Sequence, residues 1–272
     1  SASWIITNMD SIKDVTIDDL QMKCLCELKK LVEAENGLHI GEDNRILLRY
    51  LYFSNFDVPK AFTKMKSVYR LKYDSRNWFA TEVMTERQKL ALSRNVHCLL
   101  KDKDQLGRSV YLLRLGNVVI GEVEPWENFQ VDDLWLELAL DDPDTWTNGL
   151  VYIFDMQGLS WKYLRYFTPQ NCKIGSSKAE GIPVRKVEYH IINSGLILNS
   201  LVTIIFPFLS SSTKQNVHFH KNNWPSLHKY VTPDILPQEY GGKLTTLDYA
   251  DLRCYLTDNE KRLNELVSYG YQ

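Results

Sequence analysis

Two histidines in this sequence are spaced as metal ligands can be. His218 and His220 stand two positions apart on a predicted strand, so both imidazole rings could point to one side and hold a metal ion. No third ligand is evident, and Asp234 and His228 are the only further candidates that the sequence offers. We therefore interpret the pair as structural or surface histidines and predict no metal ion and no cofactor.

A single carboxylate, Asp155, has the position of a catalytic residue. It follows a predicted central strand, and active sites in α/β proteins gather at the C-terminal ends of such strands. It has no visible partner for acid–base chemistry, so we interpret it as the cap of a turn. The dinucleotide-binding, Walker A, zinc-protease and nucleophile-elbow motifs are all missing from the sequence. These observations favour binding over catalysis, and we predict that the protein is not an enzyme.

The longest apolar feature is the run 191–209, which carries no charge and follows the basic pair Arg185 and Lys186. About 20 apolar residues can span a bilayer, but polar residues dilute this run and Pro207 stands near its end. A membrane-spanning helix is therefore disfavoured. Two interpretations remain open, a helix buried in the core and a mobile lid that covers an apolar cavity and touches a bilayer when open.

The composition is that of a soluble globular protein. The chain has 272 residues, 44% of them hydrophobic and 24% charged, which suits one or two domains with a sizeable core. The net charge of −2 disfavours a general nucleic-acid-binding surface, and we expect no nucleic acid partner. Basic residues dominate 60–114, and 115–161 contains no Lys or Arg, so an anionic membrane could orient the protein.

The cysteine pattern predicts a reducing compartment. Five cysteines is an odd number, and the one close pair, Cys24 and Cys26, is not a C-x-x-C motif. The sequence therefore has no disulfide framework, and free thiols in the cytosol are the simplest account. No secretory signal precedes the first predicted helix. We expect a monomeric cytoplasmic protein.

Helices dominate the first third of the sequence, and strands and helices alternate after it. Apolar spacing and capping residues predict helices that begin near Thr16, Asp43 and Asp57. Short apolar runs predict the strands 96–100, 108–114, 149–154, 187–192 and 216–220, with helices between them. This order predicts an α/β fold with three parts, an N-terminal helical domain (1–88), an α/β domain (89–245) and a C-terminal helical tail (246–272).

Several strings in fixed order resemble the CRAL-TRIO lipid-binding family and cover about 40–245. They are 45–61 in the helical part, 104–111 at a strand entry, 149–158 at the central strand, and the closing motifs 220–227 and 236–242. The pattern is most similar to the family's α-tocopherol and retinaldehyde carriers.

The resemblance implies an α/β domain with a central mixed sheet, flanking helices and a mobile gate helix, preceded by a small helical bundle. It also implies a soluble carrier that holds one hydrophobic ligand, α-tocopherol or a similar isoprenoid, under the gate and transfers it between membranes. A phosphoinositide or phospholipid carrier and a lipid-regulated adaptor are the alternatives. The gate would occupy about 193–212, within the uncharged run.

Site residues follow from the resemblance by position. The expected ligand-binding residues are Phe129, Leu136, Leu150, Phe154, Phe167, Val184, Tyr189, Leu198, Leu201 and Ile204. The expected gate residues are Leu196, Ile197, Val202, Ile205, Phe206 and Phe208. Arg185, Lys186 and Lys214 would bind a phosphoinositide-containing membrane, peripherally and transiently.

The chain departs from the family pattern at positions that bear on the ligand. Asp132 and Asp133 stand where tocopherol carriers have a small polar and an apolar residue. Two basic residues of the family's membrane patch are missing near 51–57, and Asn216 replaces a further arginine. The segment 170–181, which lines the cavity as a helix in the family, has two glycines and few apolar residues and predicts a poor helix.

Overall fold

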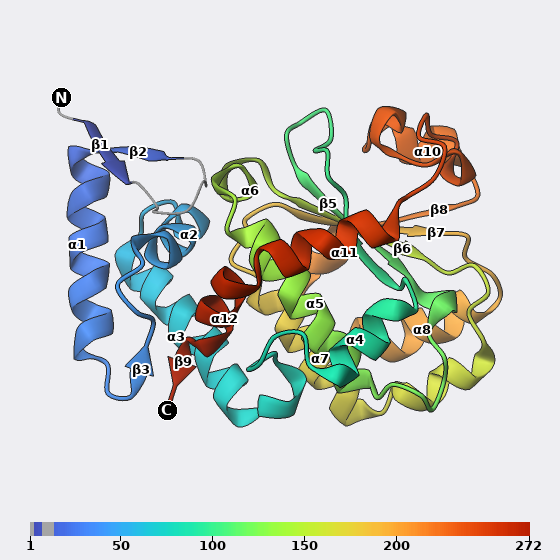
Figure 1. Cartoon of the computed structure of the whole chain (residues 1–272), viewed down its shortest axis with the longest axis horizontal. Coiled ribbons are helices and arrows are strands. Elements are labelled where there is room, and N and C mark those ends of the chain that lie inside the picture. The colour runs from blue at the N-terminus through green and yellow to red at the C-terminus, as the bar shows by residue number, and fades with distance from the viewer. Residues whose placement is uncertain (1–2, 7–13) are drawn as a thin grey trace.

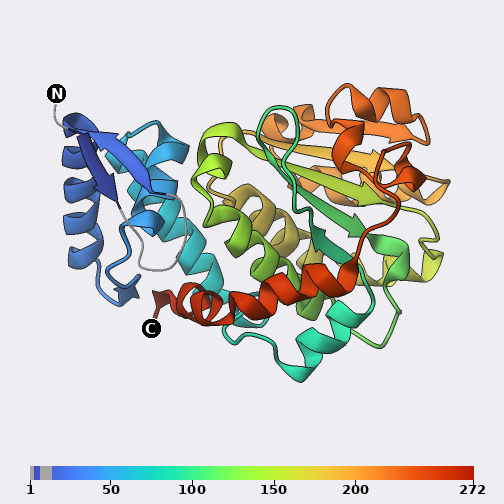
Figure 2. The same cartoon turned by 45° about the horizontal axis from the view of Figure 1, so that its top comes forward.

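The computed structural model describes residues 3–6 and 14–272 (Figures 1 and 2). Residues 1–2 and 7–13 of the predicted N-terminal domain lie outside this described part. Figure 1 shows a helical part around α1 to α3, a central sheet with helices on both sides, and a C-terminal helical segment that runs back toward the helical part.

A five-stranded sheet forms the centre of the molecule, in the order β4-β5-β6-β7-β8. Its strands are β4 (His97–Leu99), β5 (Ser109–Arg114), β6 (Leu150–Asp155), β7 (Val187–Ile192) and β8 (Val217–Lys221). β4 is antiparallel to β5, and the other neighbours are parallel. The α/β fold with a central mixed sheet is therefore confirmed.

Helices cover both faces of this sheet. Figure 1 shows α5 (Pro125–Leu140), α7 (Pro169–Gly181) and α8 (Ile197–Ile205) below the sheet and α10 (Trp224–His228) above it. The remaining helices of this part are α4 (Glu86–Ser93), α6 (Pro143–Asn148) and α9 (Ser211–Gln215). Single 3-10 turns are η1 (Arg76–Trp78), η2 (Leu115–Asn117), η4 (Phe206–Phe208), η5 (Pro233–Ile235) and η6 (Gln238–Tyr240), and η3 (Trp161–Tyr166) is longer.

The N-terminal helices begin at aspartates that cap them. The elements are β1 (Ser3–Ile6), β2 (Val15–Asp18), α1 (Asp19–Ala34), β3 (Leu38–His39), α2 (Asn44–Ser54) and α3 (Val58–Asp74). Asp43 and Asp57 accept backbone N–H groups of the first turns of α2 and α3, as the sequence predicts. The helix expected from Thr16 begins later, because β2 pairs with β1 and Asp18 accepts the amide of Gln21 at 2.8 Å.

The C-terminal segment returns to the N-terminal helices. It consists of α11 (Tyr249–Asp258), α12 (Glu260–Ser268) and β9 (Gly270–Tyr271). β9 pairs antiparallel with β3, and the Tyr271 hydroxyl donates to Glu35 at 2.8 Å. Both views show this segment crossing from the sheet to the helical part (Figures 1 and 2).

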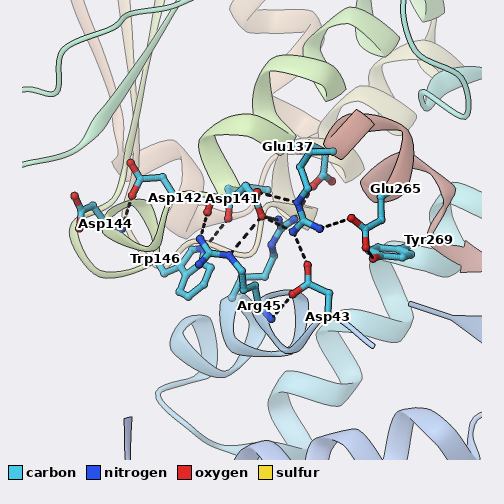
Figure 3. A network of polar contacts seen from close by, with 12 residues as sticks. Asp43, Arg45, Glu137, Asp141, Asp142, Asp144, Trp146, Glu265 and Tyr269 are labelled. Atoms are coloured by element: carbon cyan, nitrogen blue, oxygen red, sulfur yellow. Dashed lines mark hydrogen bonds and ion pairs between the residues drawn. The ribbon is translucent and has the colours of Figure 1, made fainter. Parts of the chain in front are cut away.

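A buried network of charges joins three distant segments (Figure 3). Arg262 of α12 donates to both carboxylate oxygens of Asp141, at 2.7 and 2.9 Å, and also contacts Asp43 at the start of α2. Arg49 of α2 donates to Glu137 of α5 at 2.7 Å and lies 3.9 Å from Asp141. This network therefore fixes α2 and α12 against α5.

The uncharged run does not form one continuous helix. Its first two residues end β7, and the rest is divided among a loop, α8 and η4. Within the described ranges, every helix is too short or too polar to cross a bilayer. The run therefore belongs to several elements of one folded unit.

The expectation of a poor helix at 170–181 is wrong, because the structure has the helix α7 over these residues. Thr168 caps its first turn, where Pro169 is compatible with helix geometry. Gly175 is a packing position: an added Cβ would lie 3.0 Å from Cζ of Phe129 on α5. The glycine that weakens α7 as an isolated helix thus lets it approach α5 closely.

Candidate ligand-binding site

A cavity of about 690 Å³ lies between the sheet and the helices α3, α5, α7 and α8. Its walls are mainly apolar and aromatic side chains, and a minority of charged groups lies toward α3 and α5. Sites for small organic ligands commonly measure about 300–1,000 Å³ and share this composition. The cavity is therefore large enough for one lipid-sized molecule.

Aromatic side chains of the sheet form the floor of the cavity. Tyr111, Tyr152 and Tyr189 are directly paired across β5, β6 and β7 in the strand register. The ring centroid of Tyr152 lies 5.3 Å from the ring centroids of Tyr111 and Tyr189. The Phe154 ring stacks on Tyr152 with 5.9 Å between the centroids. Alternate residues of a strand share a face, so the tyrosine row and Phe154 lie on one face of the sheet. The rings of Tyr152, Phe154 and Tyr189 stack, and the Tyr111 ring meets Tyr152 edge-on.

The helix α8 and the turn η4 cover the cavity on the side away from α3. Leu198, Leu201, Val202 and Ile205 line the cavity from α8, together with the two phenylalanines of η4. Leu201 also packs in a small cluster with Met156 and Ile197, separate from the main core. At the start of the helix, Leu196 is 86% exposed. The covering element is therefore apolar toward the cavity, and its exposed apolar residues are Leu196 before α8 and Phe208 after it.

One end of the cavity is polar and centres on Asp132 of α5. The Tyr111 hydroxyl donates to Oδ1 of Asp132 at 2.6 Å, and Nε2 of His97 lies 3.4 Å from the same oxygen. Burial raises the pKa of Asp132 to about 7, although the Tyr111 hydrogen bond and the charge of Lys178 oppose the shift. Burial likewise lowers the pKa of His97 to about 3, so this imidazole is neutral.

The neighbouring Asp133 has a different role, because it is paired. Lys178 of α7 donates to Asp133 Oδ1 and to the Trp78 carbonyl, both at 2.7 Å, and lies 3.5 Å from the ring centre of Phe79. The second oxygen of Asp133 accepts the Ala80 amide at 2.8 Å. This pair ties α7 to α5 and to the segment after η1.

The cavity brings together seven of the ten expected ligand-binding residues. These are Phe129, Leu136, Phe154, Phe167, Tyr189, Leu198 and Leu201. The other three are not part of its lining: Leu150 is fully buried at the start of β6, Val184 is buried before β7, and Ile204 is half-buried on α8. Contact with a ligand remains a prediction for all ten side chains.

The expected gate and membrane residues separate into inner and outer groups. Val202, Ile205, Phe206 and Phe208 line the cavity, whereas Leu196 points to solvent and Ile197 packs beneath α8. Arg185 and Lys186 are exposed just before β7, and Lys214 is half-buried just before β8. Because β7 and β8 are parallel, all three stand at one end of this strand pair.

Several cavity residues were not among the sequence predictions. His97, Tyr152, Tyr163 and Lys178 line the cavity, and Tyr111 reaches its polar end through Asp132. One signal was present in the sequence, since predicted neighbouring strands each carry a tyrosine at a comparable position. The contribution of Lys178 had no such signal, because its segment predicts a weak helix.

The histidine pair on β8 stacks with the ring of His190 on the neighbouring strand β7. His190 Nδ1 lies 2.8 Å from His220 Nε2, and the His190 ring stacks on His218 at 5.0 Å. His228 contacts the Tyr240 carbonyl, and Asp234 pairs with Lys243, so neither joins the pair. Across 3–6 and 14–272, the structure contains no group of three or more potential metal ligands. The interpretation as structural histidines therefore fits their contacts.

Asp155 is a structural cap with further partners. Its Oδ1 accepts the Gln157 amide at 3.0 Å, which confirms the predicted turn cap. The same oxygen accepts the Asn193 side-chain amide at 2.8 Å, and Oδ2 accepts the Tyr240 hydroxyl at 2.7 Å. Asp155 thus joins the central strand to the loop before α8 and to the closing segment of the domain.

Comparisons with known proteins agree with this geometry. Residues 93–242 match the family model of the CRAL/TRIO domain. Clavesin-2 of Homo sapiens is 27% identical over 220 residues, which cover 80% of this chain and 67% of clavesin-2. Clavesin-1 of Xenopus laevis is 27% identical over 208 residues, which cover 76% of this chain and 63% of clavesin-1. The chain thus spans about two thirds of these relatives.

A solved structure supports the fold across nearly the whole chain. The crystal structure of Sfh5 superposes with a TM-score of 0.57, covering 90% of this chain and 92% of that one. The two sequences are only 13% identical, so this likeness concerns the fold alone.

Proposed function

The chain belongs to the CRAL/TRIO family of lipid-binding proteins, and from this premise we propose that it is a carrier of one hydrophobic ligand. The ligand occupies the cavity between the tyrosine floor and α8, and the protein transfers it between membranes. The observation that carries the proposal is the cavity of about 690 Å³ under α8, whose inner side is apolar and which is preceded by the exposed Leu196. Transfer needs no covalent step, and both oxygens of Asp155 have structural partners.

The preferred ligand is α-tocopherol or a similar isoprenoid. A long apolar tail fits the aromatic floor, and its burial contributes about 25 cal/mol for each Å² removed from water. Members of the lining such as Leu136, Phe129 and Phe167 offer apolar contacts only. A phospholipid carrier is the second candidate, because the cavity has a polar end around Asp132.

Membrane contact would involve the basic residues at one end of β7 and β8. Arg185 and Lys186 are exposed just before β7, and Lys214 lies just before the parallel strand β8. Basic side chains near an anionic leaflet attract the protein to the surface. Leu196 at the exposed start of α8 could then enter the interface when the helix moves.

A substitution pair on α8 tests the carrier proposal. Leu198→Trp places a large side chain in the cavity, and Thr203→Trp places the same side chain on the exposed side of the same helix. We expect lipid extracted from the purified protein, and vesicle-to-vesicle transfer of a fluorescent tocopherol, to fall only in Leu198→Trp. Equal transfer by both variants, or a wild-type protein that takes up no lipid from vesicles, would overturn the proposal.

A further inference from the structure

The polar end of the cavity has an acceptor atom without a partner. Asp132 borders the cavity, and its side chain is 22% exposed although α5 packs inside the protein. Its Oδ1 has the Tyr111 hydroxyl at 2.6 Å. For Oδ2, the described part of the chain supplies no hydrogen bond. A carboxylate oxygen that faces an apolar cavity without a donor is a costly arrangement, which a ligand donor would relieve.

The cations that border the cavity are engaged elsewhere. Lys178 is held by Asp133, Arg49 by Glu137, and Lys72 by the carbonyls of Val267 and Tyr269. No Lys or Arg among the described residues lies within ion-pair distance of Asp132. The described residues therefore leave Asp132 Oδ2 able to accept a hydrogen bond from a bound molecule.

Further polar groups surround the same point. His97 is only 3% exposed, lines the cavity, and has no hydrogen-bond partner at Nδ1. The hydroxyls of Tyr152 and Tyr163 line the cavity without a hydrogen bond in the described structure. Burial, with a further contribution from the nearby Asp132, raises the pKa of both tyrosines, so they stay protonated. A group placed here can thus donate to a carboxylate and accept from a phenol.

We propose that this end of the cavity binds the hydroxyl group of a lipid alcohol, which donates to Asp132 Oδ2 and accepts from Tyr152 or Tyr163. The apolar remainder lies along the tyrosine floor toward α8. This inference rests on the proposed carrier function and specifies its ligand class. A lipid that ends in a carboxylate or phosphate is disfavoured, because its charge would lie beside Asp132 and Asp133 in a site of low dielectric constant.

Three lipids with the same chain test the head-group requirement. Lipid-free protein is mixed at pH 8, above the Asp132 pKa of about 7, with phosphatidylcholine vesicles that contain equal amounts of hexadecanol, hexadecyl methyl ether and palmitic acid. The protein is reisolated, and the bound lipids are extracted and quantified. We expect about tenfold more alcohol than ether, because only the alcohol donates a hydrogen bond to a charged group, and still less acid. These ratios do not depend on how much of a variant is folded.

Variants assign the preference to Asp132. Asp132→Leu removes the acceptor and should bring the alcohol-to-ether ratio close to one. Asp132→Asn removes the charge and should raise the share of palmitic acid about tenfold. The same substitutions at Asp102, an exposed carboxylate outside the cavity lining, should leave both ratios unchanged.

Other outcomes would overturn the inference. Equal binding of alcohol and ether by the wild type would show that no hydrogen bond is made, even though a carrier function would stand. Palmitic acid bound as well as the alcohol would exclude the proposed role of the carboxylate. Wild-type protein that binds none of the three lipids would overturn the carrier function and this inference together.

Discussion

Asn193 donates its side-chain amide to Asp155 Oδ1 at 2.8 Å, across the gap between the end of β6 and the loop that leads into α8. Asn193 also has a left-handed backbone, with φ of 49°. The backbone amide of Asn193 donates to the Lys221 carbonyl of β8. The residue at the start of the loop that leads into α8 is therefore fixed to two strands of the sheet.

The first prediction concerns this attachment. Asn193→Ala removes the hydrogen bond and places alanine in the left-handed region, so we expect unfolding stability to fall by about 1–3 kcal/mol. Asn193→Gly should lose less unfolding stability than Asn193→Ala, because glycine adopts the left-handed backbone without strain. Release of a fluorescent tocopherol should be several-fold faster in the alanine variant. Asn199→Ala on the exposed side of α8 is the control, and release at the wild-type rate in Asn193→Ala would contradict the attachment.

The second prediction concerns the titration of Asp132. Its folded pKa of about 7 lies above the ordinary value of 3.8, so its contribution to stability is greatest below pH 3.8 and is lost as pH rises through 7. Asp132→Asn does not titrate. Relative to lipid-free wild type, this variant should therefore gain about 2 kcal/mol in unfolding free energy between pH 5 and pH 8.

Urea unfolding of both proteins at several pH values measures this difference. A stability difference that stays constant from pH 5 to pH 8 would show that Asp132 titrates normally. The Asp133→Asn variant does not serve as a control, because it would leave Lys178 buried without its partner.

The third prediction concerns the charge network of Figure 3. Burial alone would raise the pKa of Asp141, but the hydrogen bonds and charge of Arg262, with Arg49 and Arg45, lower it below 3.8. The stability from this pairing is present above pH 3.8 and is lost as pH falls through the lower folded value. Arg262→Gln should therefore lower the free energy of unfolding by about 3 kcal/mol at pH 7, and the difference in this free energy from wild type should be smaller at pH 3.

An exposed pair provides the comparison for this network. Lys101→Gln breaks the surface contact with Asp251 and should change the stability much less, because solvent screens that pair. Equal losses from the two substitutions would mean that the buried network does not fasten α12 to α2 and α5.

The fourth prediction concerns the basic pair before β7. Arg185→Glu with Lys186→Glu should weaken binding to vesicles that contain phosphoinositide by about tenfold or more, and added salt should reduce the difference. Lys221→Glu with Lys229→Glu makes the same charge change at the last residue of β8 and at the end of α10, and should have a smaller effect. Co-sedimentation with vesicles measures both. Equal weakening by the two double variants would mean that only net charge matters.

The strands of the sheet could be predicted from the sequence because each is a short apolar run between turn residues. The run that ends at Asp155 and the run before Asn193 became β6 and β7 with nearly the expected bounds. The caps of α2 and α3 were equally local signals, since Asp43 and Asp57 act within the first turn of each helix. Local patterns therefore fixed most elements of the fold.

The parts that could not be predicted depend on contacts between distant segments. α7 is a helix because Gly175 packs on Phe129 and Lys178 pairs with Asp133, neither of which is visible in the propensity of its own residues. Asp132 of α5 was noted as a departure from the family, but its partners Tyr111 and His97 come from the strands β5 and β4. A cavity and its polar end arise from such tertiary contacts.

The pairing of β3 with β9 affects how the protein folds during its synthesis on the ribosome. Tyr271 reaches Glu35 across 236 positions of sequence, and at about 5–20 residues per second a ribosome needs roughly 10–50 s to add them. During that time α1 to α3 lack α12 and Arg262, and part of their apolar surface has no cover. An N-terminal unit usually folds first during synthesis, but here its final packing must wait for the last helix to leave the exit tunnel. We therefore expect these nascent helices to expose apolar surface until α12 has been synthesised.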